Sequence, residues 1–425
     1  MKNSKVVKIL KNEYIFSVGT RIVSIVISML QSIIVARYLG AELKGVNAYI
    51  ASITSVGSII ITFGMHQAYP YFRKKFGKDA IYSDFVSITM LIYFIYLVAA
   101  VALAVFVPVS IELKASFVLI PLLGYSNVVA YITLVESPNL RNAWWTIISV
   151  LDIVYVVILW IFVTRNIYWA ISILLFADLL KCVVYTILLK VKPRFHRGMF
   201  KFLIELAKYG FFPMLALLMT TLNYRIDVLM LRQFDGITDS MIGLYSLGIS
   251  LSDKIVLIPD TLKGVLVSKL AKGAPDIEVA KVCRLGLWTS MALCLAVMAL
   301  GKFVINIFYG DEYSGAYSVV LITAAGVLAV SYFKLIAQYN IVNKRQKLNV
   351  LMLCIAVVID VVFNLLFIPM WGIEGAALAT CLGNVVCGIV FIIYFCRHTG
   401  IHVSDMILIK KSDLSLLKSL VKKKK

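Results

Sequence analysis

The sequence predicts an all-helical integral membrane protein, and three observations carry this prediction. About twelve apolar stretches of roughly 20 residues, the length of a membrane-spanning helix, are separated by short polar connections. Hydrophobic residues make up 61% of the 425 residues and charged residues only 15%, unlike a soluble domain. No connection is long enough for a soluble catalytic domain, so we expect transport and not catalysis.

Apolar length and helix-breaking residues place the spans in order along the chain. We expect them at residues 14–36, 46–65, 85–107, 117–135, 145–164, 168–189, 211–231, 243–266, 285–309, 315–338, 350–368 and 373–396. The longest basic connection divides them into two sets of six. The predicted organisation is an N-terminal lobe (1–190), a cytoplasmic linker (191–209), a C-terminal lobe (210–396) and a basic cytoplasmic tail (397–425).

Positive charge is distributed unevenly over the connections. Of the 42 Lys and Arg residues, 30 lie on the side of the two termini and only 5 on the opposite side. The positive-inside rule therefore predicts cytoplasmic N- and C-termini. This asymmetry accounts for most of the net charge of +20 without a nucleic-acid partner. Because the first apolar run is too long for a signal peptide, we expect a retained first helix.

Two basic segments are expected at the membrane surface. In the linker, charged residues recur at positions 197, 201, 205 and 208, and the opposite face is formed by Phe202, Leu203 and Leu206. This spacing is typical of an interfacial amphipathic helix, and a linker between the halves is its simplest role. In the tail, apolar residues before the four lysines at 422–425 predict a membrane-surface anchor.

The sequence offers no metal, cofactor or catalytic site. The seven cysteines lie in spans or in a cytoplasmic connection without metal-ligand spacing, so we expect free thiols acting as small apolar side chains. The four histidines are scattered. No spaced acid and base pair stands in an outer connection, as a hydrolase or transferase needs. We therefore assign no metal, no cofactor and no enzymatic activity.

The first span carries a polar stripe. Its members follow one another on one helix face at steps of four, three, four and three residues: Ser17, Arg21, Ser24, Ser28 and Gln31. Such a stripe is costly against lipid, so it is expected to line a cavity or a helix interface. The alternative is that Arg21 snorkels to the cytoplasmic surface while the serines pack helices.

The seventh span carries three polar residues near its outer end, Asn223, Arg225 and Asp227. Residues two apart on a helix do not face each other, so Arg225 and Asp227 each need a partner elsewhere. Substrate contact and an interhelical clamp are equally compatible with this pattern.

The eighth span adds charges of both signs. Asp260 and Lys263, three residues apart beside Pro259, predict a local ion pair at a kink. Asp253 lies deeper, where a carboxyl group can exchange a proton, which makes it a candidate for ion coupling. A static pair of Asp253 with Lys181 or Lys334 is the alternative.

A faint similarity relates the two halves. Residues 37–40, which end the first span and lead to Gly45, are similar to residues 232–236, which end the seventh and lead to Gly243. This indicates two parallel six-helix repeats, and such repeats usually hold the substrate at their mutual interface.

Five motifs in succession carry a family resemblance over nearly the whole chain. They are RIVSIVISMLQSIIVARYLGAELKG at 21–45, Asn223-x-Arg225-x-Asp227, Gly243-Leu-Tyr245-Ser246, Phe308-Tyr309-Gly310-Asp311-Glu312-Tyr313 and the run from Asn364 to Ala377 that contains Phe367-Ile368-Pro369 and Gly372-Ile373. This succession resembles the bacterial polysaccharide repeat-unit flippases of the O-antigen type, within the multidrug/oligosaccharidyl-lipid/polysaccharide exporter superfamily.

The resemblance implies two six-helix lobes around a central cavity that opens to either side in turn. It implies that a polyprenyl-diphosphate-linked oligosaccharide is flipped from the cytoplasmic to the outer leaflet of the bacterial cytoplasmic membrane for surface polysaccharide synthesis. Arg21 fits a place where arginines hold the diphosphate, a role that suits bidentate guanidinium groups. Membrane lipids, a polysaccharide polymerase and other assembly proteins are the partners expected with it.

Two alternatives stay open. A multidrug or cation antiporter has the same fold, but its cavity should be acidic, whereas the charge on the first polar stripe is Arg21. A membrane glycan polymerase or ligase should present a large outer loop with catalytic groups, and the outer connections here are short.

Overall fold

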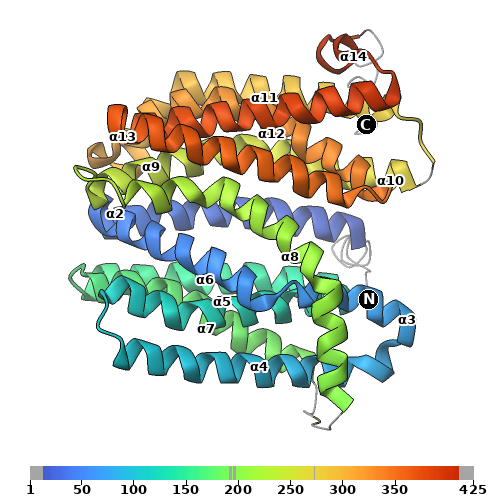
Figure 1. The fold of residues 1–425 in the computed structure, drawn as a ribbon. Coiled ribbons are helices and arrows are strands. Elements are labelled where there is room, and N and C mark those ends of the chain that lie inside the picture. The colour runs from blue at the N-terminus through green and yellow to red at the C-terminus, as the bar shows by residue number, and fades with distance from the viewer. Residues whose placement is uncertain (1–12, 191–193, 195–197, 272, 411–425) are drawn as a thin grey trace, which may run out of the picture. The chain divides into compact units, whose positions relative to one another are not determined.

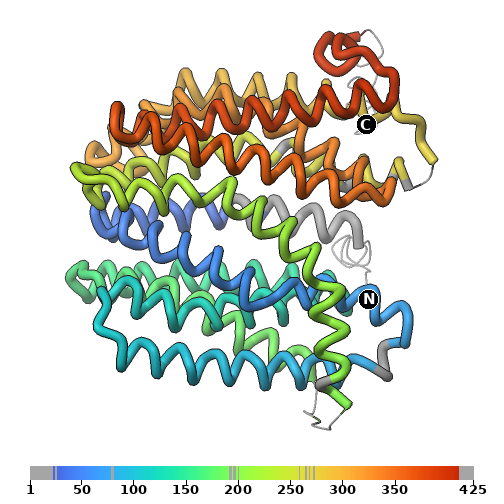
Figure 2. The backbone as a smooth tube through the Cα atoms, viewed as in Figure 1, coloured from blue at the N-terminus to red at the C-terminus, as the bar shows by residue number. Residues whose placement is uncertain are grey.

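The computed structural model describes residues 13–190, 194, 198–271 and 273–410 (Figures 1 and 2). Every regular element among them is a helix. Ten of the described helical segments are long and apolar enough to cross a membrane. Two of these, Val26–Phe76 and Gln346–Thr399, run for 51 and 54 residues, more than twice the length of one crossing. Each contains two predicted spans, so the prediction of twelve spans is confirmed.

Both long helices are broken at a glycine. Helix α2 (Glu13–Thr62) changes direction at Gly40, whose φ of 71° and ψ of 174° are not helical. Helix α13 (Gln346–Thr399) does so at Gly372, with φ 57° and ψ −127°. A positive φ strains any residue with a β-carbon, and glycine adopts it freely. These two glycines therefore turn the chain from one crossing directly into the next.

The chain forms two compact units. Unit 1 comprises Met1–Thr221 and Thr238–Gly243, and unit 2 comprises Leu222–Ile237 and Leu244–Lys425. The boundary lies inside a helix, α8 (Gly198–Leu231), and not in the basic connection before it. The division into lobes at the linker 191–209 stays a prediction.

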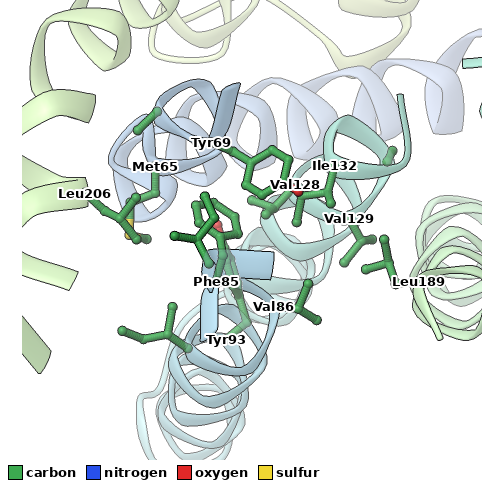
Figure 3. Close-up of a cluster of buried hydrophobic side chains, with 14 of the residues drawn as sticks. Met65, Tyr69, Phe85, Val86, Tyr93, Val128, Val129, Ile132, Leu189 and Leu206 are labelled. Atoms are coloured by element: carbon green, nitrogen blue, oxygen red, sulfur yellow. The ribbon is translucent and has the colours of Figure 1, made fainter. Parts of the chain in front are cut away.

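Unit 1 contains α2 and six further helical elements. They are α3 (Met65–Phe76), α4 (Lys78–Phe106), α5 (Ile111–Glu136), α6 (Pro138–Phe162), α7 (Ile167–Leu189) and the first part of α8. Their largest described apolar cluster gathers buried side chains from α3, α4, α5, α6, α7 and α8 (Figure 3). At its centre the rings of Tyr69 and Phe85 lie 4.9 Å apart, and both residues are fully buried.

The amphipathic segment of the linker begins this same α8. Leu206 is fully buried in the apolar cluster of unit 1, and Phe202 and Leu203 pack against it. This apolar face therefore packs against the core of unit 1, and the segment continues without a break into the seventh span. Its predicted place on the membrane surface stays a prediction. Because this face is buried, the first turns of α8 belong to the core of unit 1. This explains why the boundary between the two compact units lies inside α8.

Two glycines of the resemblance motifs meet within unit 1. A β-carbon on Gly45 of α2 would lie 1.8 Å from the Asp239 carbonyl oxygen, at the start of α9 (Asp239–Ser252). A β-carbon on Gly243 would lie 1.9 Å from the carbonyl oxygen of Ala41. The two backbones approach so closely that only glycine fits at either position.

Unit 2 is built around α12 (Ala316–Val342), the most buried of the candidate spans. The other elements are the end of α8, most of α9, η1 (Asp253–Val256), α10 (Leu257–Ala271), α11 (Ile277–Val304), η2 (Ile305–Tyr309), η3 (Asp311–Tyr313), α13 and α14 (Val403–Ile407). All seven cysteines of the chain are free thiols, as predicted. The predicted ion pair between Lys263 and Asp260 is confirmed, with Nζ and Oδ1 2.7 Å apart.

Helix α14 ties the chain after α13 back onto unit 2. Three successive carbonyl oxygens at its end, those of residues 405–407, accept hydrogen bonds from Arg284, Tyr332 and Trp288. Carbonyls in the last turn of a helix lack intrahelical donors, so these side chains complete the helix end. An ammonium group at Lys410 also lowers the pKa of Asp405 by bonding its carboxylate.

Candidate functional site

Unit 2 encloses a small polar cavity. It has a volume of about 20 Å³ and is lined by Asn223, Tyr224, Asp227, Ile249, Ser252, Asp253, Thr323, Val327, Val330, Thr380 and Asn384. A polar space of this size holds one water molecule or one small ion, because a single water needs about 10–15 Å³. The cavity is too small for an organic substrate.

Asp227 is the acidic centre of this region. It is 3% exposed, and both its carboxylate oxygens accept hydrogen bonds from neutral groups. Asn364 Nδ2 donates to Oδ1 at 2.7 Å, and Thr380 Oγ1 lies 2.9 Å from Oδ2. The hydroxyl of Tyr245 is 2.9 Å from that of Thr380 and extends the network. Asp227 is thus held firmly, but by groups that carry no positive charge.

A second carboxyl group lies against the first. Asp360, 1% exposed, stands one helical turn before Asn364 on α13, and its Oδ1 accepts from Asn364 Nδ2 at 3.2 Å. Asn364 Nδ2 lies within hydrogen-bond distance of an oxygen of each carboxyl group, which holds Asp227 and Asp360 close together. Two buried carboxylates this close repel each other and are both desolvated, so a proton or a cation between them would stabilise the pair.

The oxygen atoms around this pair outnumber the donors. Besides the hydroxyl of Tyr224 on the cavity wall, three buried oxygens close to this pair have no hydrogen-bond partner among the described residues: Oδ2 of Asp360, Oδ1 of Asn364 and Oδ1 of Asn223. All three are acceptors, and a buried acceptor without a partner costs free energy. Oxygen-only surroundings with a surplus of negative charge suit a hard cation or a proton. No group of three or more His, Cys, Asp or Glu side chains gathers anywhere in the described residues.

A cluster of charged side chains lies beside the cavity on four elements of unit 2. Its cations are Arg225, Lys254, Lys263 and Lys334, and its anions are Asp253 and Asp260. Lys334 Nζ is 3.2 Å from Asp260 Oδ2 and also lies 5.6 Å from the ring centre of Tyr224. We call this set the basic cluster, since cations exceed anions by two.

The backbone of the eighth span changes form where it carries part of this cluster. Helix α9 ends at Ser252, the 3₁₀ turn η1 follows, and α10 begins at Leu257. Pro259 cannot donate to the carbonyl oxygen four residues earlier, which explains why the α-helix does not continue through this point. The break positions Asp253 and Lys254 at mid-span.

The structure separates the predicted site residues. Asn223 and Asp227 are buried, whereas Arg225 is exposed. Asp253 lines the cavity and lies within electrostatic reach of Lys334 and Arg225. Arg225 and Asp227 have different partners, as their spacing predicted.

On the first span, the structure describes only part of the polar stripe. Gln31 donates a hydrogen bond to Asp152 inside unit 1, and Ser28 is half-buried. The side chains of Arg21 and Ser24 lie outside the described part of the chain, and the assignment of Arg21 to a diphosphate stays a prediction.

The sequence interpretation missed Asp360, Asn364 and Thr380 as members of the site. The spacing of Asp360 and Asn364, four residues on one helix face, was a usable signal. Nothing in the sequence pairs either residue with Asp227, 133 or more positions earlier.

Comparison with known proteins finds one similar sequence and several similar folds. No family model matches. In sequence, 173 residues are 23% identical to the capsular polysaccharide biosynthesis protein CapF of Staphylococcus aureus, a match over 38% of this chain and 44% of that protein. The match thus spans less than half the length of that relative.

Solved structures are similar over nearly the whole chain. The lipid II flippase MurJ in an inward closed conformation has a TM-score of 0.74 at 15% identity, covering 96% of this chain and 92% of its own. An inward-facing multidrug resistance transporter of the MATE family has a TM-score of 0.67 at 12% identity, covering 89% and 94%. The chain is therefore a multi-pass membrane protein with the all-helical, two-lobe fold of these flippases and transporters.

Proposed function

We propose that the protein flips polyprenyl-diphosphate-linked oligosaccharide repeat units from the cytoplasmic to the outer leaflet by alternating access, for synthesis of a surface polysaccharide. The proposal includes cytoplasmic termini and a bacterial cytoplasmic membrane as its setting. No covalent bond changes in this process. The fold supports a flippase or transporter, and the similarity to the capsular polysaccharide biosynthesis protein CapF supports a polysaccharide unit as cargo.

The observation that carries the proposal is the charge of the basic cluster. Its four cations and two anions leave a surplus of two positive charges within membrane-spanning elements, where charges are rare without a function. A diphosphate diester carries two negative charges and matches this surplus. Arg225 is exposed on its span, and a guanidinium group binds phosphate oxygens in a bidentate manner.

Membrane potential supplies a driving force for this direction of transport. Each negative charge that leaves an inside-negative cell gains about 2.3 kcal/mol per 100 mV. At a potential of about 100 mV, the two charges of a diphosphate together gain roughly 4–5 kcal/mol. Flipping in potential-clamped vesicles is therefore expected to slow when the potential is collapsed, and an unchanged rate excludes this energy source.

A second part of the proposal assigns ion coupling to unit 2. The pair of Asp227 and Asp360 binds a proton or a small monovalent cation, supported by the unpartnered oxygens around it. Asp253 stays a further candidate for coupling, since it lines the same cavity. The alternative function, antiport of an organic cation, fits less well, because the acidic region is a cavity of about 20 Å³.

Reconstitution tests the cargo. Vesicles that hold the purified protein and a polyprenyl-diphosphate oligosaccharide with a labelled headgroup are assayed for headgroup exposure to a membrane-impermeant quencher. Arg225→Gln should slow flipping about 10- to 100-fold, because a charge-assisted hydrogen bond contributes about 1.5–3 kcal/mol. Lys302→Gln, an exposed cation on α11 outside the cluster, is the matched control and should change the rate less than twofold.

Two results would overturn the proposal. One is an equal effect of both substitutions, which makes the basic cluster irrelevant. The other is transport of an organic cation in exchange for protons or Na⁺ by vesicles that flip no headgroup.

A further inference from the structure

Unit 1 contains a second buried polar cluster, which the proposed transport mechanism does not use. It joins Gln31 of α2, Asp152 of α6, and Asp178 and Lys181 of α7. Asp152 is 2% exposed and Asp178 is 7% exposed. Both acids lie near the middle of apolar helices, where an unneutralised charge is costly.

The contacts show how far this cluster is neutralised. Lys181 Nζ lies 2.9 Å from Asp178 Oδ1, and Lys181 also acts electrostatically on Asp152. Gln31 Nε2 donates to one oxygen of Asp152, and the other oxygen, Oδ1, is buried without a hydrogen-bond partner among the described residues. The ammonium group additionally lies 5.4 Å from the ring centre of Trp145. Two acids thus share one fixed cation.

The internal repeat relates this cluster to the one in unit 2. Gln31 stands nine residues before Gly40, and Asp227 stands nine residues before Gly236, and both glycines have positive φ. Asp152 stands 14 residues after the first residue of α6, and Asp360 stands 14 residues after the first residue of α13.

The third helix of each cluster follows the same register. Asp178 stands 11 residues into α7, which begins at Ile167, and Asn384 stands 11 residues after Ile373, the first residue beyond the break at Gly372. Asn384 lines the cavity of unit 2. Three helices in corresponding order therefore contribute to each cluster.

The two clusters differ in their charges. Three residues after Asp178 stands Lys181, whereas three residues after Asn384 stands Cys387, a small neutral side chain. The cluster of unit 1 therefore has two acids and one lysine, for a net charge of −1. The carboxyl pair of unit 2, Asp227 and Asp360, has a net charge of −2, and its hydrogen-bond partners Asn364 and Thr380 are neutral.

We propose that the ammonium group of Lys181 takes the place of one bound cation. Because Lys181 neutralises one of the two carboxylates, the cluster of unit 1 needs one proton or metal cation fewer from solution. Since Lys181 is part of the chain, its charge cannot leave the cluster of unit 1. In the proposed mechanism, only the site in unit 2 then binds and releases an ion. Without Lys181, the oxygens of Gln31, Asp152 and Asp178 would form a site for a monovalent cation, either Na⁺ or a proton. This inference uses the proposed ion site of unit 2 for comparison only.

Thermal unfolding of the purified protein in detergent tests the inference. All variants are made in an Asp227→Asn background, so that the carboxyl pair of unit 2 no longer contributes. Unfolding temperatures are measured in NaCl and in choline chloride at equal ionic strength and pH 8, and again in choline chloride at pH 5.5. If Na⁺ raises the unfolding temperature of the wild type but not of Asp227→Asn, the proposed ion site of unit 2 is supported. This comparison does not depend on the Lys181 variants.

In choline chloride at pH 8, the Lys181→Met variant in this background should unfold at a lower temperature than its Asp227→Asn parent. It should recover by about 2–5 °C or more in NaCl if the new site takes Na⁺, or at pH 5.5 alone if it takes a proton. Lys181→Arg keeps the charge and should respond to neither. A Lys181→Met protein that is insensitive to both Na⁺ and acid overturns the inference.

A double variant keeps the test decisive if Lys181→Met fails to accumulate. Adding Asp178→Asn removes one negative charge together with the positive one and preserves the shape of the acid. Accumulation should return to the level of the parent, with no response to Na⁺. Failure of the double variant to accumulate would show that Lys181 acts through packing and not through its charge.

Discussion

Asp360→Asn should make the ion-free protein more stable, and this is the sharpest test of the carboxyl pair. Asn364 Nδ2 lies 2.7 Å from Asp227 Oδ1 and 3.2 Å from Asp360 Oδ1. The two oxygens are therefore no more than about 6 Å apart, and with an effective dielectric constant near 20 two full charges at that distance repel by about 3 kcal/mol. The substitution removes this repulsion and leaves the side-chain shape nearly unchanged.

The measurement is thermal unfolding with and without Na⁺ at constant ionic strength and a pH at which carboxyl groups in water are ionised. Asp360→Asn should gain about 1–3 kcal/mol without Na⁺, should lose most of the response to Na⁺, and should lose ion-dependent flipping in vesicles. Asp311→Asn, an exposed acid of η3, is the matched control and should change neither quantity. A variant that is no more stable without Na⁺ and that Na⁺ stabilises as strongly as wild type would refute the reasoning.

Two further predictions concern the backbone. Gly243→Val should lower the folded yield severalfold, because its β-carbon would fall 1.9 Å from a carbonyl oxygen and overpacking alone costs about 1–3 kcal/mol. Gly315→Ala, whose β-carbon meets only a flexible leucine methyl group at 3.1 Å, should leave the yield unchanged, and equal yields of the two variants would contradict the close approach. Arg284→Met should destabilise α14 by about 1.5–3 kcal/mol, seen as faster proteolytic cleavage within residues 400–410. Unchanged cleavage would show that the guanidinium group is not needed there.

The spans could be predicted because apolar length is a local property of the sequence. The same holds for the ion pair of Asp260 and Lys263 and for the apolar face that contains Leu206, since both depend on spacings within one helix. The union of the first two spans into one broken helix was not predicted, because Gly40 permits either a loop or a sharp turn. Local patterns indicate where helices lie but not how abruptly they connect.

The composition of the site required the structure. Asp227 meets Asn364 and Thr380, which are 137 and 153 positions away, and helix periodicity does not show which faces of distant helices meet. Asn223, Arg225 and Asp227 formed a single motif in the sequence, yet two of them are buried and one is exposed. In the proposed mechanism, residues of this one motif therefore have different roles: Asp227 binds the ion and Arg225 binds the substrate.

Every covalent passage between the two compact units falls within residues 221–244. The chain changes unit at Thr221 and Leu222, at Ile237 and Thr238, and at Gly243 and Leu244. The three crossings lie within 24 residues of one another along the chain. Asp227 belongs to the same stretch, so one carboxylate of the proposed ion site lies on the part of the chain that joins the two units.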